Sequence, residues 1–143
     1  MIRDVKELIE YKLKDLYPLA TIYDEVKPTN SVKPSFLIQV VDQKYTKILR
    51  DKYKSVISFK TTYFSDKNEN EIKNDILKVQ RELFRELELL EGLNFKIRLL
   101  NKGIEIVNNE LNFMFDVKYS EEKIIDYAKI NKIEQINSNF KED

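Results

Sequence analysis

A chain of 143 residues is long enough for one domain with one real core, and its hydrophobic fraction of 42% argues against intrinsic disorder. The 25 basic and 25 acidic residues balance to a formal net charge of zero, so charge gives no general reason to expect nucleic acid or an anionic membrane as partner. Without Cys or His, the chain cannot form disulfides, zinc sites, or Cys–His and Ser–His catalytic arrangements.

The N-terminal segment predicts an amphipathic helix over residues 2–17. One face of this helix collects apolar residues at steps of three and four, namely Ile2, Val5, Ile9, Leu13 and Leu16. Pro18 disfavours helical geometry at Tyr17 and therefore ends the helix there. The β-prone residues 21–23 predict a short strand, and the Pro- and Asn-containing residues 26–34 predict a loop.

Residues 36–63 predict a hairpin with an unusually long arm or loop. A strand is expected at 36–41, followed by a polar and basic segment at 42–52. Residues 53–63 then alternate in character, with Tyr53, Ile57, Phe59 and Tyr63 on one face. Long connections inside compact domains are usually functional or mobile, which draws attention to 42–52.

The longest periodic stretch runs over residues 66–91 and predicts the main helix. Its apolar stripe consists of Ile72, Ile76, Val79, Leu83, Leu87 and Leu90. Asp66 or Asn68, each followed three residues later by Glu, offers a capping-box-like start. Gly92 can end the helix because glycine takes the left-handed conformation readily. Leu77 and Phe84 lie one heptad apart outside the stripe, where they either widen the buried face or form a second seam for a partner subunit.

Further strands are expected after this helix. Strand potential at 95–100 is followed by a break at 101–103, and then by two strands, 104–107 and 111–119, around a two-residue Asn-Asn turn. The order is α-β-β-β-α-β-β, with room for one more strand. It predicts an α+β fold in which two helices pack on one face of a mainly antiparallel sheet of about five to six strands.

The segment after Ser120 has a different pattern. Apolar residues recur at every third position, namely Ile124, Tyr127, Ile130, Ile133 and Ile136. This step drifts around a helix, so the segment is either a short element with a frayed end or an arm that docks on a neighbouring molecule. We therefore expect one domain at 1–120 and a C-terminal extension at 121–143.

The search for catalytic chemistry is mostly negative. The two glycines are too far apart for a phosphate-binding or dinucleotide-binding loop. Carboxylates that could hold Mg²⁺ fit helix capping and solvated strand faces better; they are Asp66, Glu69 and Glu71, or Glu105 and Glu110. We predict no catalytic, metal-binding or cofactor-binding residues, no cofactor and no enzymatic activity.

The basic run at 44–54, with Tyr45 and Tyr53 interleaved, is the nearest approach to a nucleic-acid patch. The simpler interpretation is a solvated loop and an outward strand face, on which Lys54 and Lys60 discourage unwanted sheet pairing. The same charges could steer this surface onto an acidic neighbour.

Several segments, taken in order, resemble the tail-terminator family of Gram-positive phages with contractile tails and of phage-tail-like bacteriocins. The similarity rests on the N-terminal helix leading to residues 21–23, on residues 33–38 (KPSFLI), which are similar to the family's Arg/Lys-Pro-x-Phe strand start, and on the strand at 53–64. It continues through residues 109–113 (NELNF) to the strand ending at Tyr119. The chain has Ser65 where the family pattern has Pro, and residues beyond 120 match weakly.

This resemblance implies a structural protein that forms a homo-oligomeric ring, typically sixfold, on the last ring of the tail tube. Such a ring halts addition of tube subunits and offers a platform to the sheath, and to a head connector where a head exists. The protein would assemble in the bacterial host cytoplasm and become part of an infectious phage or a headless bacteriocin particle, with neither a membrane nor sequence-specific nucleic acid as partner. No apolar run approaches membrane-spanning length, which agrees with this expectation.

We expect the ring and sheath interfaces on the sheet edges, on the 42–52 arm and on the C-terminal segment. The candidate interface residues are Lys44, Tyr45, Lys47, Ile48, Arg50, Lys52, Leu77, Phe84, Ile130, Ile133 and Ile136. Alternative functions are a head–tail joining or other tail-assembly adaptor, a small nucleic-acid-binding module using residues 44–54, and a metal-dependent enzyme.

Overall fold

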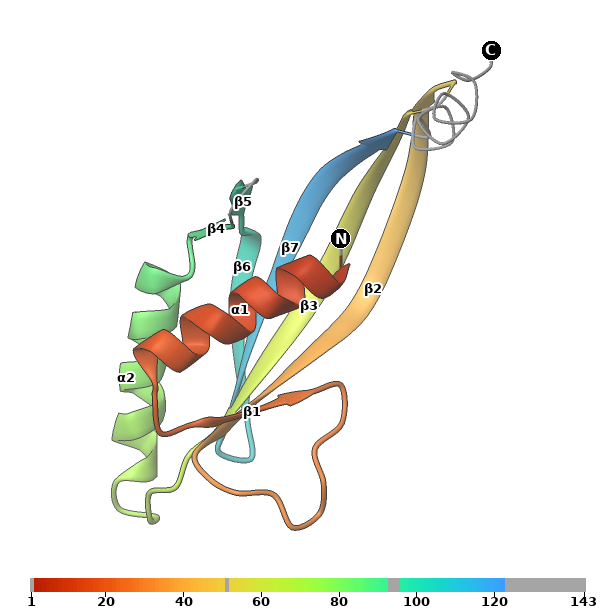
Figure 1. The fold of residues 1–143 in the computed structure, drawn as a ribbon. Helices are drawn as coiled ribbons and strands as arrows, with labels where there is room; N and C mark the ends of the chain where they lie inside the picture. The colour runs from red at the N-terminus through yellow and green to blue at the C-terminus, as the bar shows by residue number, and fades with distance from the viewer. Residues whose placement is uncertain (1, 51, 93–95, 123–143) are drawn as a thin grey trace. The chain divides into compact units, whose positions relative to one another are not determined.

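A computed structural model describes residues 2–50, 52–92 and 96–122, with side-chain surroundings up to residue 118. The elements, labelled in Figure 1, are α1 (Ile2–Leu16), β1 (Thr21–Asp24), β2 (Ser35–Leu49), β3 (Lys52–Phe64), α2 (Ile72–Glu86), β4 (Leu89–Glu91), β5 (Lys96–Arg98), β6 (Leu100–Val107) and β7 (Glu110–Glu122). The chain divides into two compact units. Among the described residues, 2–43, 57–92 and 96–117 belong to the first unit, and 44–50, 52–56 and 118–122 belong to the second.

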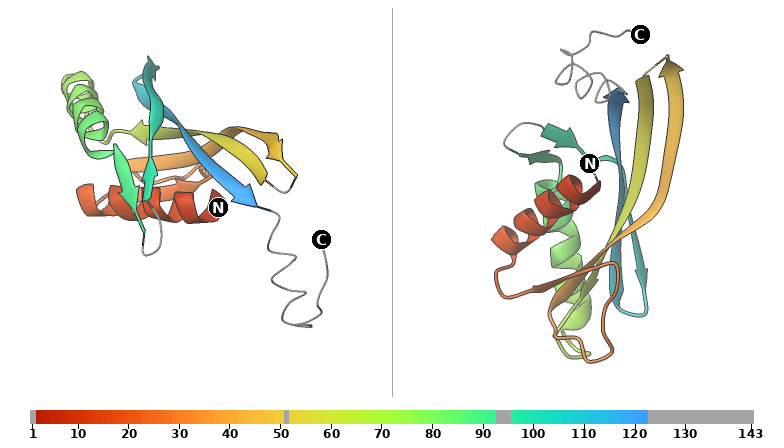
Figure 2. Two further views of the ribbon diagram at one scale, coloured as in Figure 1. Left: turned by 90° about the horizontal axis from the view of Figure 1, so that it is seen from above. Right: turned by 45° about the vertical axis from the view of Figure 1, so that its right-hand side comes forward.

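The fold is α+β, as the order of predicted elements indicates. Five strands form one sheet in the order β1-β2-β3-β7-β6, and β4 pairs with β5 in a separate two-stranded sheet. In the first unit both helices cover the same face of the larger sheet (Figure 2). The sheet is mainly antiparallel, but β1 and β2 run parallel, with Thr21 opposite Ser35 and Asp24 opposite Ile38.

The core of the first unit lies between the two helices and the sheet. Each helix contributes three fully buried apolar side chains; they are Val5, Ile9 and Leu13 of α1 and Ile76, Val79 and Leu83 of α2. The sheet contributes aromatic rings, among which Phe59 stacks on Phe115 with 5.5 Å between ring centroids. Burying such a side chain stabilises the fold by about 1.5–3 kcal/mol, so the periodic apolar positions account for the packing of both helices.

The prediction for the first helix is confirmed. The helix ends at Leu16, and the Tyr17 N–H still donates to the Leu13 carbonyl oxygen at 2.7 Å. Pro18 follows directly and prevents a further helical turn.

The main helix is shorter than the predicted range of 66–91. At its start, Asn68 Oδ1 accepts the backbone N–H groups of Asn70 and Glu71 at 3.1 and 3.2 Å. This side chain supports a turn that precedes the helix, because short amide side chains compete with helical backbone bonds. The helix therefore begins at Ile72, and residues 66–71 form an exposed connection.

The predicted end of this helix at Gly92 is also wrong. Leu87 leaves helical geometry with φ −95° and ψ 71°, and residues 89–91 pair with β5. Gly92 does not have a positive φ. Leu87 and Leu90 are nevertheless buried, at 0% and 2% exposure. The apolar spacing continues past the helix because Leu87, just after the helix, and Leu90, in β4, are both buried although neither is helical.

The hairpin formed by β2 and β3 has a long arm and not a long loop. β2 continues as a strand to Leu49 and β3 begins at Lys52, so most of the polar segment 42–52 is strand. Buried positions alternate in β3 at Ser55, Ile57 and Phe59, as the sequence predicted. Between Lys44 and Arg50, every side chain is exposed.

The C-terminal hairpin forms where it was predicted. Val107 lies opposite Glu110, and the two turn residues Asn108 and Asn109 have φ of 52° and 61°, as a two-residue turn with left-handed geometry requires. The predicted break at 101–103 is instead an irregularity within β6, where the register shifts between Leu100 and Gly103. Asn101 has a φ of 53° at this bulge.

Candidate interaction surfaces

The candidate carboxylates for metal chemistry lie on the surface and do not converge. Asp66, Glu69 and Glu71 belong to the exposed connection before α2, and Glu105 is exposed on β6. Within the described ranges, no three acidic side chains are grouped so that they could hold a metal ion. None of the described helices is long and apolar enough to span a membrane.

The structure brings six predicted interface residues together at the end of the β2–β3 hairpin, which we call the hairpin end (residues 44–54). Lys44, Tyr45, Lys47 and Ile48 lie on β2, Arg50 lies at the turn, and Lys52 lies on β3. Large apolar side chains are exposed between the basic ones, with Tyr45 at 59%, Ile48 at 50% and Leu49 at 62% exposure. Five basic residues and one acidic residue give this segment a net charge of +4.

The outer face of α2 carries the predicted interface residues Leu77 and Phe84, which differ in exposure and in packing. Leu77 is 50% exposed and lines two shallow hollows, one toward Phe84 and one toward Ile106 of β6. Phe84 is 36% exposed and packs edge-on against Phe113, with 5.5 Å between ring centroids. Leu77 is therefore available to a partner, whereas Phe84 also widens the buried face.

A basic side chain fixes the end of α2 next to this face. Lys102 Nζ lies 5.6 Å from the centre of the Phe84 ring and donates to the Phe84 carbonyl oxygen at 3.2 Å. It also bonds to the carboxylate of Glu88, and this hydrogen bond holds the pKa of Glu88 below its ordinary value. Capping of the last carbonyls by a cation is favourable at a helix C-terminus.

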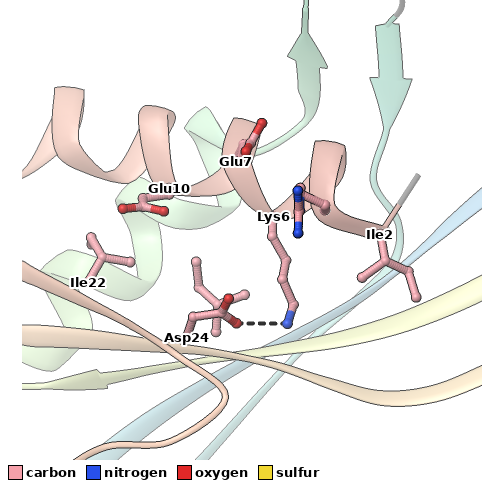
Figure 3. A pocket seen from close by; sticks show the side chains of 8 residues that line it. Ile2, Lys6, Glu7, Glu10, Ile22 and Asp24 are labelled. Atoms are coloured by element: carbon pink, nitrogen blue, oxygen red, sulfur yellow. Dashed lines mark hydrogen bonds and ion pairs between the residues drawn. The ribbon is translucent and has the colours of Figure 1, made fainter.

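Sequence reasoning missed a hollow of about 400 Å³ between α1 and the first two strands (Figure 3). Its lining residues are Ile2, Arg3, Lys6, Glu7, Glu10, Ile22, Asp24 and Ile38. In Figure 3, Lys6 reaches from α1 to Asp24 of β1, with Glu7 and Glu10 projecting from the same helix. The sequence did show these charged residues outside the apolar stripe of the helix, but it did not show what they face.

An ion-pair network fixes the floor of this α1 hollow. Lys6 Nζ lies 2.7 Å from Asp24 Oδ1 and 2.5 Å from Glu25 Oε2, and the Lys6 side chain is only 16% exposed. Burial opposes the charge of Lys6, but the hydrogen bonds to the two carboxylates outweigh it and raise its pKa. Glu25 adopts a φ of 66°, and its carboxylate also accepts the N–H of Val40 at 3.0 Å.

A second polar network joins β3 to the start of α2. Asp75 Oδ2 accepts the hydroxyl of Tyr63 at 2.7 Å and that of Ser65 at 2.5 Å. Nearby, the Tyr17 hydroxyl donates to Glu82 Oε1 at 2.5 Å. Burial, followed by these hydrogen bonds to carboxylates, raises the pKa of both Tyr17 and Tyr63. These hydrogen bonds join β3, and the residue that follows α1, to α2.

In the part of the chain that the structure describes, the edge strands of the larger sheet are β1 and β6, because these strands end the strand order. β1 has four residues and β6 has eight. The predicted residues Ile130, Ile133 and Ile136 lie outside the described residues, so their placement stays a prediction.

Comparison with known proteins yields one family match. The model described as "Phage tail terminator protein" matches residues 4–129. Among the solved structures that are similar to this chain, one has a TM-score of 0.39 and 8% sequence identity, over 81% of this chain and 92% of that one. A likeness at this level carries no argument about function. No relative was found among curated proteins.

Proposed function

The chain belongs to the phage tail terminator family, and from that premise we propose that its copies close into a ring of six on the end of the tail tube. Family membership makes the protein a structural component of tail assembly, and hence of the virion particle, that interacts with other tail components. In our proposal the ring halts further addition of tube subunits and anchors the sheath, and a head connector where one exists. It assembles in the bacterial host cytoplasm and performs no catalysis.

The observation that carries the proposal is the family match, and the exposed surfaces support it. A ring of identical subunits needs a head-to-tail interface made from two different patches of one chain. The hairpin end, the outer face of α2 and the free edges β1 and β6 offer such patches. A net charge of zero presents no overall electrostatic obstacle to self-association.

The domain boundary remains part of the proposal. We place the ring-forming domain at residues 1–120, and we assign the extension at 121–143 to contact with the sheath or with a neighbouring copy. Extended segments often bind by adding a strand or by lying in a groove.

The test is the mass of the purified protein by light scattering, alone and with its co-expressed tube and sheath proteins. We expect a closed oligomer near six copies, alone or only on the tube, and shorter tubes when the protein is present during tube polymerisation. A chain that remains monomeric and binds neither protein would overturn the proposal. Binding to a head connector without binding to the tube would instead favour a head–tail adaptor.

A further inference from the structure

The hairpin end combines charge with exposed apolar surface. Lys47, Arg50 and Lys54 form no ion pair with another described residue. Ile48 is 50% exposed and Leu49 is 62% exposed. Exposed apolar side chains set among cations at the end of a hairpin mark a candidate interaction site. Its net charge of +4 calls for an acidic partner surface, because like charges in contact oppose docking.

The same chain must carry the compensating charge. Its formal net charge is zero, so the residues outside the hairpin end hold a net charge of −4. The rest of the chain therefore has more carboxylates than cations, so a second copy of this chain can supply an acidic surface. No foreign partner is needed to supply the complement.

Two described surfaces of the first unit are acidic, and one of them fits better. The residues around the α1 hollow include two cations, Arg3 and Lys6, and four carboxylates, which gives a net charge of −2; the carboxylates are Glu7, Glu10, Asp24 and Glu25. The exposed connection 66–71 also has a net charge of −2.

The two surfaces differ in whether they contain apolar residues. The α1 hollow has Ile2, Ile22 and Ile38 in its lining, whereas the connection 66–71 consists of polar and charged residues. A hollow of about 400 Å³ with this lining can receive an aliphatic stem or an apolar side chain, while its carboxylates pair with the cationic heads. The hairpin end presents both kinds of group.

We propose that the hairpin end of one copy docks into the α1 hollow of the next copy and forms the head-to-tail interface of the ring. This inference rests on the proposed function and specifies which two surfaces meet. Lys47, Arg50 and Lys54 pair with Glu7, Glu10 and Asp24, and Ile48 and Leu49 contact the apolar lining. Lys6 keeps Asp24 and Glu25 in place and is not itself available to the partner.

The experiment is a charge swap, read out in whichever setting the unaltered chain assembles, alone or on the tube. One variant carries Lys47→Glu, Arg50→Glu and Lys54→Glu, and a second carries Glu7→Lys and Glu10→Lys. Each reversal places like charges in contact, so we expect each variant alone to associate at least about tenfold more weakly. A third variant carries both sets of changes, which restores opposite charges and should recover the ring.

Mixing provides an independent arm of the same test. The first two variants combined in equal amounts can alternate around a ring, with opposite charges at every interface, and should assemble where neither does alone. The control Lys33→Glu with Lys78→Glu changes two exposed positions outside both surfaces, outside the connection 66–71 and outside the hollows that Leu77 lines, and should leave assembly unchanged. Thermal unfolding of every variant, and of the milder pair Glu7→Gln with Glu10→Gln, shows that loss of association is not loss of fold.

Each outcome bears on the inference. Full-strength rings from the hairpin variant would overturn it while leaving the proposed function intact. Loss with the hairpin variant but not with the α1 variant would overturn the choice of the α1 hollow and point to the connection 66–71. The pairing would also be overturned if the variant with both sets of changes and the mixture of the first two variants stay folded but form no rings. An unaltered chain that never assembles would contradict the proposed function itself.

Discussion

Asp75 joins two parts of the chain at the start of α2. Its carboxylate accepts the hydroxyls of Tyr63, at the end of β3, and of Ser65, just after it. Ser65 also accepts the backbone N–H of Lys67 at 3.1 Å. The resemblance described above predicts Pro at position 65, and proline has no hydroxyl. The serine in this chain therefore supplies a side-chain contact that sets the path from strand to helix.

We predict that Asp75→Ala lowers the free energy of unfolding by about 1–3 kcal/mol, because the two hydroxyls lose their acceptor in a partly buried place. Chemical denaturation of the variant measures the change. Asp66→Ala is the matched control, since Asp66 is exposed, and its effect should stay within about 0.5 kcal/mol. Equal effects at the two positions would show that the network does not stabilise the fold.

At the scale of elements, the β6–β7 hairpin shows local sequence determining local structure. Asn108 and Asn109 both have positive φ, a conformation that Asn tolerates better than most residues. The register then places Ile106 opposite Leu111 and Ile104 opposite Phe113. The turn therefore sets which side chains of β7 enter the core.

Asn109→Val tests this dependence on the turn. A β-branched residue at a φ of 61° is strained, so we expect the free energy of unfolding to fall by about 1–2 kcal/mol. Asn109→Gly, which adopts this conformation freely, should leave stability the same or slightly higher. Thermal or chemical unfolding compares the two variants, and a Val variant as stable as the Gly variant would contradict the role of the turn.

α2 is the element for which sequence periodicity was least accurate. The buried spacing runs through Leu87 and Leu90, but the helix stops at Glu86, Leu87 lies in the connection that follows, and Leu90 lies in β4. The spacing of apolar residues indicates which positions are buried, and it does not show the backbone geometry. Buried positions that follow a helix can therefore make the predicted helix longer than the real one. Pairing of β4 with β5 decided the boundary, and that partner lies farther along the chain.

At the scale of the whole molecule, the proposed ring assigns each exposed surface to a contact with another copy or with another tail component. The hairpin end and the α1 hollow supply two different patches, as a closed heterologous interface requires. Leu77 on the outer face of α2 and the free edge of β6 remain for other tail components. The extension from residue 121 is assigned to the sheath or to a neighbouring copy.

Deleting residues 128–143 tests the role of the extension. We expect the fold to keep its unfolding temperature and the protein to lose at least about tenfold in binding to the sheath protein or to a neighbouring copy, because an arm contributes contact area without being part of the core. Light scattering and sheath pull-down measure this. In the full-length chain, Ile130→Ser, Ile133→Ser and Ile136→Ser should reproduce the loss. Normal rings and normal tail assembly in both variants would remove the extension from the proposal.

The sequence by itself determined the fold class, the order of the principal elements, the end of α1 and the Asn-Asn turn. These features depend on local periods, on the restrictions that Pro imposes and on the conformations that Asn tolerates, all of which act within a few residues. It also carried the resemblance to the tail-terminator family, which the family match confirms.

Only the tertiary structure decided the parallel pairing of β1 with β2, the true ends of α2 and the α1 hollow. Lys6 meets Asp24 and Glu25, which lie 18 and 19 positions away in the chain, only because β1 folds back beneath α1. Long-range pairings of this kind depend on which strand is available as a partner and on which charges packing brings together, and no local pattern records either.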